Sequence, residues 1–235
     1  SEHSAIFQAM RSGRPDEVSR VYLTASGGPF RTWPPERMET ATVAEALNHP
    51  TWSMGPKITI DSATMMNKAL EIVEAHYLFE LASEQIEVLI HPESIVHSMV
   101  EFRDGSTIAQ LGTPDMKIPI QYAITFPRRV PGRAPTLDWS VARSLNFEPP
   151  DLERFPALRL GHEAAQRGGT CGAVLNAANE AAVERFRAGE IPFGKIAVLA
   201  EQTLARHRFI EQPTLAELMS ADAWARCEVC ECIRV

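Results

Sequence analysis

Polar side chains recur at helical spacing in the segment DSATMMNKALEIVE. Asn67, Lys68 and Glu71 lie at positions i, i+1 and i+4, and so share one face of a helix. Because the start of a helix presents unpaired N–H groups and a positive dipole end, Ser62, Asn67 and Lys68 could hold a phosphate there. Glu71, one turn further along, could hold a hard divalent cation beside that phosphate. The alternative is the solvent-facing polar side of an ordinary amphipathic helix.

Two further segments could complete a pocket for an anion. Ser26 opens a turn with two glycines after a β-prone run, and the backbone N–H groups of such a turn can form an anion-binding concavity. The loop HPTWSMG, which contains His49, Trp52, Met54 and Gly55, could close over a ligand and exclude water. Ordinary turn formation and the anchoring of a long loop to the core are the alternative explanations.

The hydrophobic pattern predicts an α+β scaffold for these residues, with a small mixed sheet covered by helices and followed by an α-helical bundle. A helix is expected from Ala63 to about Leu81, capped by Asp61 or Ser62. Alternation of apolar and polar residues predicts strands at 18–24, 86–90, 94–102 and 106–111. Apolar spacing near 3.6 predicts helices at 158–167, 171–188, 192–206 and 214–226.

A proline-rich stretch lies between the two halves of this pattern. Six of the 17 prolines fall between Pro127 and Pro156, with little periodicity, which is typical of a linker. The sequence therefore predicts a catalytic domain at 1–126, a linker at 127–155 and a C-terminal helical domain at 156–235.

The composition argues against several classes of protein. With 30 acidic against 23 basic residues and no basic run, the chain lacks the charge pattern of a nucleic-acid-binding protein. No apolar stretch approaches the roughly 20 residues that cross a bilayer, so we expect no membrane segment and a cytoplasmic location. Three of the four cysteines lie in the tail CEVCEC, where reduced thiols on a terminal helix are favoured over a metal site.

His91 and His97 lack metal-ligand spacing, and we interpret them as structural.

Seven motifs in order along the chain resemble the 1-deoxy-D-xylulose 5-phosphate reductoisomerase family. They are SEHSAIFQ, SGGPFR, HPTWSMG, DSATMMNKALEIVEA, HPESIVHSMV, TPDMKIPI and LNAANEAAV. The resemblance covers essentially the whole chain apart from its C-terminal end.

This resemblance implies an NADPH-dependent enzyme of isoprenoid biosynthesis that also needs Mg²⁺ or Mn²⁺. Its substrate is a small phosphorylated sugar, 1-deoxy-D-xylulose 5-phosphate, which is rearranged and then reduced to 2-C-methyl-D-erythritol 4-phosphate. The family also implies a homodimer, in the cytoplasm of a bacterium or the stroma of a plastid. By similarity, Glu2 and Glu71 match metal ligands, and Ser1 matches a residue at the substrate backbone. Four residues match phosphate ligands: Ser26, Ser62, Asn67 and Lys68. His49 matches a substrate contact, Trp52 and Met54 match a lid, and Gly55 matches a position near the nicotinamide.

Two family features have no counterpart in the sequence. The family has an aspartate directly before the pair that matches Ser1 and Glu2, and it has an N-terminal NADPH-binding domain with a glycine-rich turn. We therefore expect the chain to be part of a longer protein and to be inactive alone. The alternatives are a non-catalytic phosphosugar-binding or assembly fragment and a related reductase that acts on another sugar phosphate.

Overall fold

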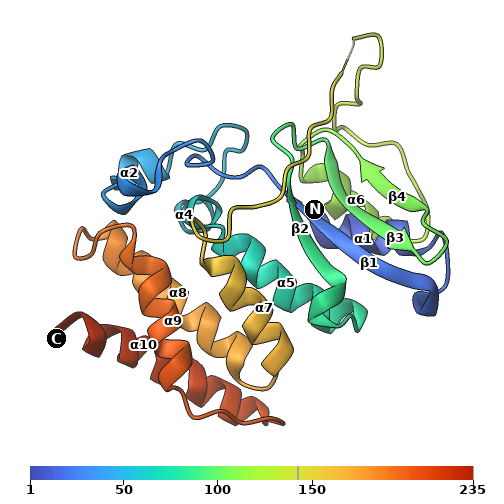
Figure 1. Ribbon diagram of the computed structural model, residues 1–235. Coiled ribbons are helices and arrows are strands. Elements are labelled where there is room, and N and C mark those ends of the chain that lie inside the picture. The colour runs from blue at the N-terminus through green and yellow to red at the C-terminus, as the bar shows by residue number, and fades with distance from the viewer. Residues whose placement is uncertain (142, 235) are drawn as a thin grey trace. The chain divides into compact units, whose positions relative to one another are not determined.

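A computed structural model describes residues 1–141 and 143–234 (Figure 1). The chain forms two compact units, each assembled from two separate stretches. The sheet unit comprises Ser1–Ser26 and Glu84–Pro150, and the helical unit comprises Gly27–Ser83 and Asp151–Val235. This division differs from the consecutive domains predicted at 1–126 and 156–235, because part of the first half packs with the C-terminal helices.

The sheet unit is built on a four-stranded mixed sheet with strand order β2-β1-β3-β4. Its strands are β1 (Val18–Ala25), β2 (Ile86–Ile90), β3 (Val96–Phe102) and β4 (Thr107–Leu111). β1 runs parallel to β2 and antiparallel to β3, which pairs antiparallel with β4. The four strand predictions and the small mixed sheet are therefore confirmed.

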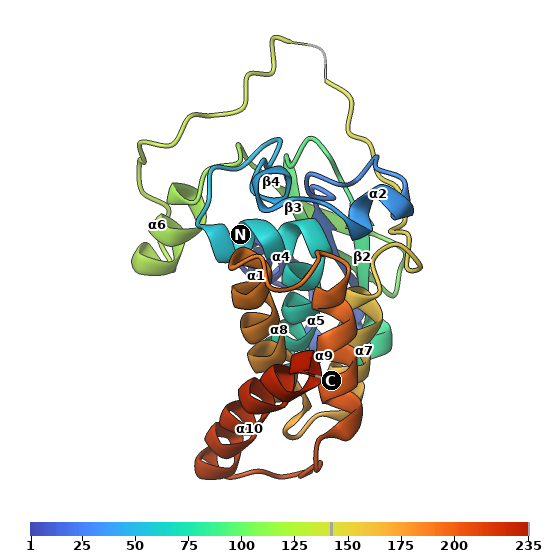
Figure 2. The ribbon, with the colours of Figure 1, turned by 90° about the vertical axis from the view of Figure 1, so that its left-hand side faces the viewer.

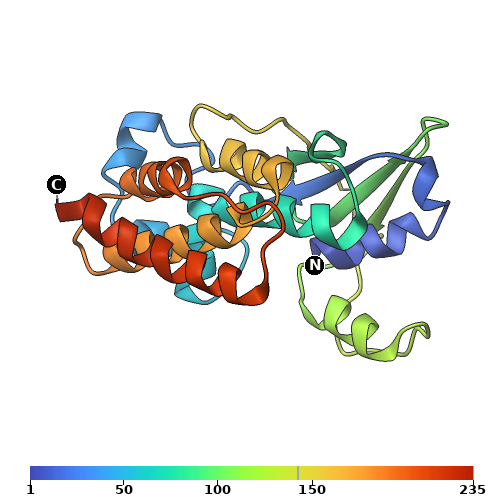
Figure 3. The same ribbon diagram turned by 90° about the horizontal axis from the view of Figure 1, so that it is seen from below.

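Helix α1 (Glu2–Met10) packs against β1, β3 and β4 and covers one face of the sheet (Figure 3). Alternate residues such as Val21 and Leu23 are fully buried, as expected for strands with one face toward a core. Helix α6 (Lys117–Thr125), which contacts α1, was not predicted, because the segment is short and contains Pro119. The unit also contains the short 3₁₀ helix η1 (Pro15–Glu17), and a second one, η2 (Ser83–Gln85), begins at the last residue of the helical unit.

The segment predicted as a linker is largely part of the sheet unit. No helix forms in its described residues from 127 to 150. Near its end, the N–H of Ile90 donates to the carbonyl of Glu148 at 2.8 Å, and the reverse bond measures 3.0 Å. This bridge ties the end of the segment to β2.

The helical unit contains a bundle of helices from the C-terminal part of the chain (Figure 2). Leu158, Leu175 and Leu204 are among the large side chains that it buries. Its helices are α2 (Pro35–Glu39), α3 (Val43–Ala46), α4 (Pro56–Thr64), α5 (Met66–Phe79), α7 (Ala157–Arg167), α8 (Cys171–Arg187), α9 (Lys195–Arg206) and α10 (Leu215–Arg234). α5 packs against α7, and α8 packs against both α9 and α10. The predicted bundle is confirmed, and the tail cysteines lie on α10 as free thiols.

The predicted helix from Ala63 to about Leu81 is wrong at its start. Two helices occupy this region, and they are separated by Met65, whose φ of 59° is left-handed. α4 begins at Pro56, which suits the first position of a helix because its fixed φ is helical and its missing N–H is not needed there. Ser62 therefore lies in the last turn of α4, and neither Asp61 nor Ser62 caps α5.

Candidate functional site

Three of the predicted ligands contact one another in the first turns of α5. Asn67 Nδ2 donates a hydrogen bond to Glu71 Oε1 at 2.6 Å, and Lys68 Nζ lies 2.6 Å from Glu71 Oε2. Lys68 is only 3% exposed and Glu71 only 8%. The alternative of a solvent-facing polar stripe therefore does not apply to these two residues.

The partners of Glu71 determine what the cluster can do. Both carboxylate oxygens face donors, so an ammonium and an amide compensate the buried carboxylate. A buried ion pair of this kind is costly to break from one side, because the remaining charge loses its partner. An incoming anion could pair with Lys68 while a cation pairs with Glu71, so that both charges stay compensated.

His49 of the predicted lid is hydrogen bonded to Ser62 of α4. The N–H groups of Thr51 and Trp52 donate to His49 Nδ1 at 3.1 and 2.9 Å. Because Nδ1 accepts, the proton of the neutral ring is on Nε2, which donates to Ser62 Oγ at 3.1 Å. Burial lowers the pKa of His49, which favours this neutral form. Two residues from separate motifs are thus brought together.

The glycine turn after β1 packs directly on the same serine. Gly28 has a left-handed φ of 67°, and a Cβ at this position would lie 2.5 Å from the backbone oxygen of Ser62. Only glycine fits there without moving α4. The close approach explains the second glycine of the SGGPFR motif.

The other lid residues precede α4. Trp52 and Met54 are half-buried, and Gly55 is exposed and forms the N-cap of α4. A Cβ at Gly55 would meet no atom within 4 Å. The space beside the backbone at this position is therefore open.

The remaining predicted ligands belong to the sheet unit. Ser1 Oγ donates to Glu2 Oε2 at 2.8 Å, and Ser26 follows directly after β1. Glu2 also acts electrostatically on His97, whose pKa is lowered chiefly by burial and is partly restored by the glutamate. Ser1, Glu2 and Ser26 thus lie in one unit, and His49, Ser62, Asn67, Lys68 and Glu71 in the other.

One polar contact beside Ser62 was not predicted. Asp61 is 1% exposed, and its Oδ1 accepts a hydrogen bond from Asn179 Nδ2 of α8 at 2.8 Å. Its Oδ2 lies 2.7 Å from Lys57 Nζ. Burial raises the pKa of Asp61, against the opposing effects of Lys57 and Asn179. The available signal was an asparagine on the apolar face of the helix at LNAANEAAV.

Across residues 1–141 and 143–234, no three His, Cys, Asp or Glu side chains form a group that could hold a metal ion. None of the helices in this part of the chain combines the length and apolar character needed to span a bilayer. A cavity of about 690 Å³ in the sheet unit, between β4, α6 and the segment after α6, contains none of the predicted ligands.

Two models of known protein families match separate parts of this chain. A family model described as the DXP reductoisomerase C-terminal domain matches residues 111–228. A second, described as the 1-deoxy-D-xylulose 5-phosphate reductoisomerase C-terminal domain, matches residues 1–79.

Curated relatives and solved structures carry the same name. The 1-deoxy-D-xylulose 5-phosphate reductoisomerase of Acetivibrio thermocellus is 54% identical over 226 residues, covering 96% of this chain and 59% of the relative. That of a Geobacillus species is 55% identical over 227 residues, covering 96% and 60%. The solved enzyme of Zymomonas mobilis in complex with NADPH has a TM-score of 0.92 at 45% identity, covering 99% of this chain and 60% of that one.

A further solved DOX-P reductoisomerase, in complex with NADPH, fosmidomycin and magnesium, has a TM-score of 0.91 at 43% identity. The match covers 100% of this chain and 62% of that chain. The chain therefore spans about three fifths of the length of the relatives it matches.

Proposed function

Because the chain belongs to the family of 1-deoxy-D-xylulose 5-phosphate reductoisomerase C-terminal domains, we propose that it supplies the substrate, metal and lid portions of such an enzyme. The reaction is the NADPH-dependent rearrangement and reduction of 1-deoxy-D-xylulose 5-phosphate to 2-C-methyl-D-erythritol 4-phosphate. The observation that carries the proposal is the cluster near the start of α5, in which half-buried Asn67 and buried Lys68 both contact buried Glu71.

The phosphate of the substrate is assigned to Ser62, Asn67, Lys68 and Ser26. Lys68 and Asn67 lie in the first turn of α5, where the helix dipole also favours an anion. Lys68 supplies a full positive charge in a buried place, where its attraction for phosphate is strong. Binding energy from the phosphate can then orient the reacting carbons, and Ser1 is assigned to the substrate backbone.

Glu71 and Glu2 are assigned as carboxylate ligands of Mg²⁺ or Mn²⁺. The chemistry of Glu71 fits this role. Both of its oxygens already face positively polarised hydrogens, and carboxylate oxygens are hard ligands of the kind that Mg²⁺ and Mn²⁺ prefer. When bound, the cation supplies a Lewis acid for the carbonyl and hydroxyl oxygens of the substrate. The change of partner from Lys68 to a cation keeps the Glu71 charge compensated.

The loop with His49, Trp52 and Met54 is assigned as a lid. His49 donates a hydrogen bond to Ser62, so a movement of the loop changes the position of the Ser62 hydroxyl, a proposed phosphate ligand. Trp52 and Met54 offer apolar surface that can exclude water from the intermediate. The open backbone at Gly55 is assigned to the approach of the nicotinamide of NADPH.

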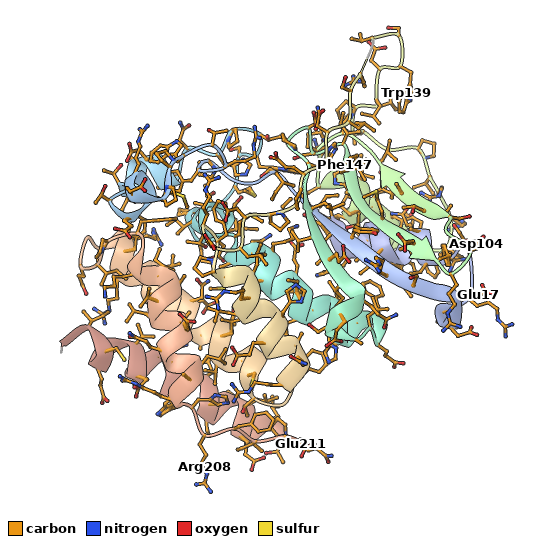
Figure 4. All side chains as sticks on the ribbon, viewed as in Figure 1. Glu17, Asp104, Trp139, Phe147, Arg208 and Glu211 are labelled. Carbon is orange, nitrogen blue, oxygen red and sulfur yellow. The ribbon has the colours of Figure 1, made fainter. Side chains whose placement is uncertain are left out.

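The enzyme is also proposed to be a homodimer formed through the sheet unit. β4 is an edge strand of the sheet, and the neighbouring α6 exposes Ile120 and Ile124, the latter 78% exposed. Trp139, 70% exposed, lies toward the tip of the extended segment that follows α6 (Figure 4). Exposed apolar surface and an unpaired strand edge are typical of an interface.

Sedimentation tests the dimer directly. The change Ile124→Glu should shift the protein from dimer to monomer, because it places a charge in the proposed interface. The control is Leu78→Glu in the helical unit, where Leu78 is 62% exposed, and this variant should remain a dimer. A monomeric wild-type protein at micromolar concentration would contradict the assignment.

The activity is tested by following NADPH oxidation in the complete protein with Mg²⁺ or Mn²⁺ and 1-deoxy-D-xylulose 5-phosphate. Turnover of this substrate, and not of other sugar phosphates, distinguishes the proposal from a related reductase. The 235-residue chain alone should show negligible turnover, and measurable activity would contradict that expectation.

Since bacterial relatives are 54–55% identical to this chain, we propose a cytoplasmic location, or the stroma if the source has plastids. Cell fractionation tests this location.

A further inference from the structure

The last turn of α4 is held to the bundle by a buried polar contact. Asp61 and Asn179 are 1% and 0% exposed, and their side chains form a hydrogen bond of 2.8 Å between α4 and α8. Lys57 pairs with the other carboxylate oxygen from one turn earlier in α4. Ser62 is the next residue after Asp61, so the contact lies beside the proposed phosphate ligand.

Stability alone does not account for such a contact. Burying a carboxylate is costly, and well-packed apolar residues commonly serve a core as well as or better than a buried polar pair. Asn179 also pays a visible cost, since its Oδ1 has no hydrogen-bond partner in the described chain. The pair fixes the orientation of α4 on α8, because a planar amide and a carboxylate restrict each other's orientation more strictly than apolar groups do.

The local backbone explains why Ser62 needs an anchor. The helical hydrogen-bond pattern stops at Met65, so the orientation of Ser62 is not transmitted through a continuous helix to Lys68. The contacts of Ser62 that depend on this placement are the hydrogen bond from His49 and the close approach of Gly28 to its carbonyl.

We propose that Asp61 and Asn179 are positioning residues that fix the Ser62 hydroxyl for the phosphate of the substrate. The inference rests on the proposed function, since it concerns a ligand of the same site. Loss of the contact lets the last turn of α4 shift, and Ser62 then loses its alignment with the lid histidine and with the bound phosphate.

The test is a double-mutant cycle in the complete enzyme. Asn179→Leu keeps the approximate volume but removes the donor, and it should raise KM for the sugar phosphate about tenfold, as expected for one charge-assisted hydrogen bond, with a smaller change in kcat. Because the effect acts through Ser62, the double variant with Ser62→Ala should be no worse than Ser62→Ala alone. The exchange Asp61→Asn with Asn179→Asp restores a hydrogen bond between α4 and α8 but moves the carboxylate away from Lys57, so it should recover part of the change in KM.

A matched control separates positioning from general destabilisation. Thr170→Val removes two hydrogen bonds within the same unit: Thr170 Oγ1 lies 3.0 Å from His207 Nε2 and accepts from the N–H of Ile210 at 3.2 Å. This variant should lower the melting temperature and leave KM unchanged.

Two results would overturn the inference and leave the proposed function intact. They are equal increases of KM in Asn179→Leu and Thr170→Val, or independent, multiplying effects of Asn179→Leu and Ser62→Ala. If the wild-type enzyme does not turn over the sugar phosphate, or Ser62→Ala has the wild-type KM, the proposed function fails and the inference fails with it.

Discussion

The contact between α5 and α7 leaves no room for a methyl group at Gly161. Gly161 is buried in α7, and a Cβ there would lie 2.5 Å from the backbone oxygen and 2.6 Å from the Cα of Ala69 in α5. Ordinary contacts of this kind need about 3.4 Å or more, so the two helices would have to separate by nearly 1 Å. Since the obstacle is backbone, a change of rotamer cannot relieve it.

The expected cost of Gly161→Ala follows from two opposing effects. Alanine is favoured over glycine in a helix interior by about 1 kcal/mol. Overpacking of a core costs about 1–3 kcal/mol, and a collision with backbone belongs near the upper end. The net loss in the free energy of unfolding is therefore about 1–2 kcal/mol, or roughly 2–8 °C in melting temperature for a chain of this size.

Urea and thermal unfolding followed by circular dichroism measure this loss. The matched control is Gly172→Ala in α8, where the new Cβ would meet only a terminal methyl of Val73, at 3.0 Å. That side chain can move, so this variant should be neutral or slightly more stable than wild type. If Gly161→Ala is as stable as Gly172→Ala, the close backbone approach of α5 and α7 is incorrect.

Three further predictions concern the candidate site. Lys68→Met should lower the free energy of unfolding by about 3 kcal/mol, because the buried Glu71 charge loses its ammonium, and adding Glu71→Gln should recover most of it in urea unfolding. Because burial lowers the pKa of His49, the folded state disfavours its protonation; stability should fall as the pH drops through about 6.5 and level off below the folded pKa. His49→Gln should flatten this part of the stability profile between pH 8 and 5. Gly28→Ala should raise KM for the sugar phosphate about tenfold by displacing Ser62, and an unchanged KM would contradict the proposed packing.

The strands and the C-terminal helices could be predicted because their residues follow a simple periodicity. Ile86, Val88 and Ile90 alternate with half-buried residues, as in any strand with one face toward a core. α7 to α9 keep their apolar residues near a period of 3.6, and glycines or prolines separate them. In these elements, the side chains that are buried in the structure are the ones that the apolar pattern of the sequence marks.

The break between α4 and α5 could not be predicted in the same way. Apolar spacing continues from Met66 to Leu70 and beyond, and a methionine is not expected at a left-handed position that favours glycine or asparagine. Tertiary packing around Met65, which is 2% exposed, overrides the local preference. The shared helix face of Asn67, Lys68 and Glu71 was predicted, and these side chains do contact one another, but Ser62 lies on a different helix.

The domain boundaries depend on contacts that no local pattern encodes. A proline-rich stretch suggested a break after residue 126, yet that stretch ends on β2 through Glu148. The packing of α5 against α7 assigns residues of the first half to the helical unit. Residues that pair in this way, such as Ala69 and Gly161, are about 90 positions apart in the chain, so periodicity alone cannot predict their contact.

The interleaved order of the two units affects how the protein is made. During translation, the surface of α5 around Ala69 leaves the ribosome well before α7 and α8 have been synthesised. At common elongation rates of about 5–20 residues per second, this apolar surface waits for roughly 4–20 s. A nascent chain in that condition is a natural client for chaperones, and slow codons within residues 84–150 should increase its aggregation.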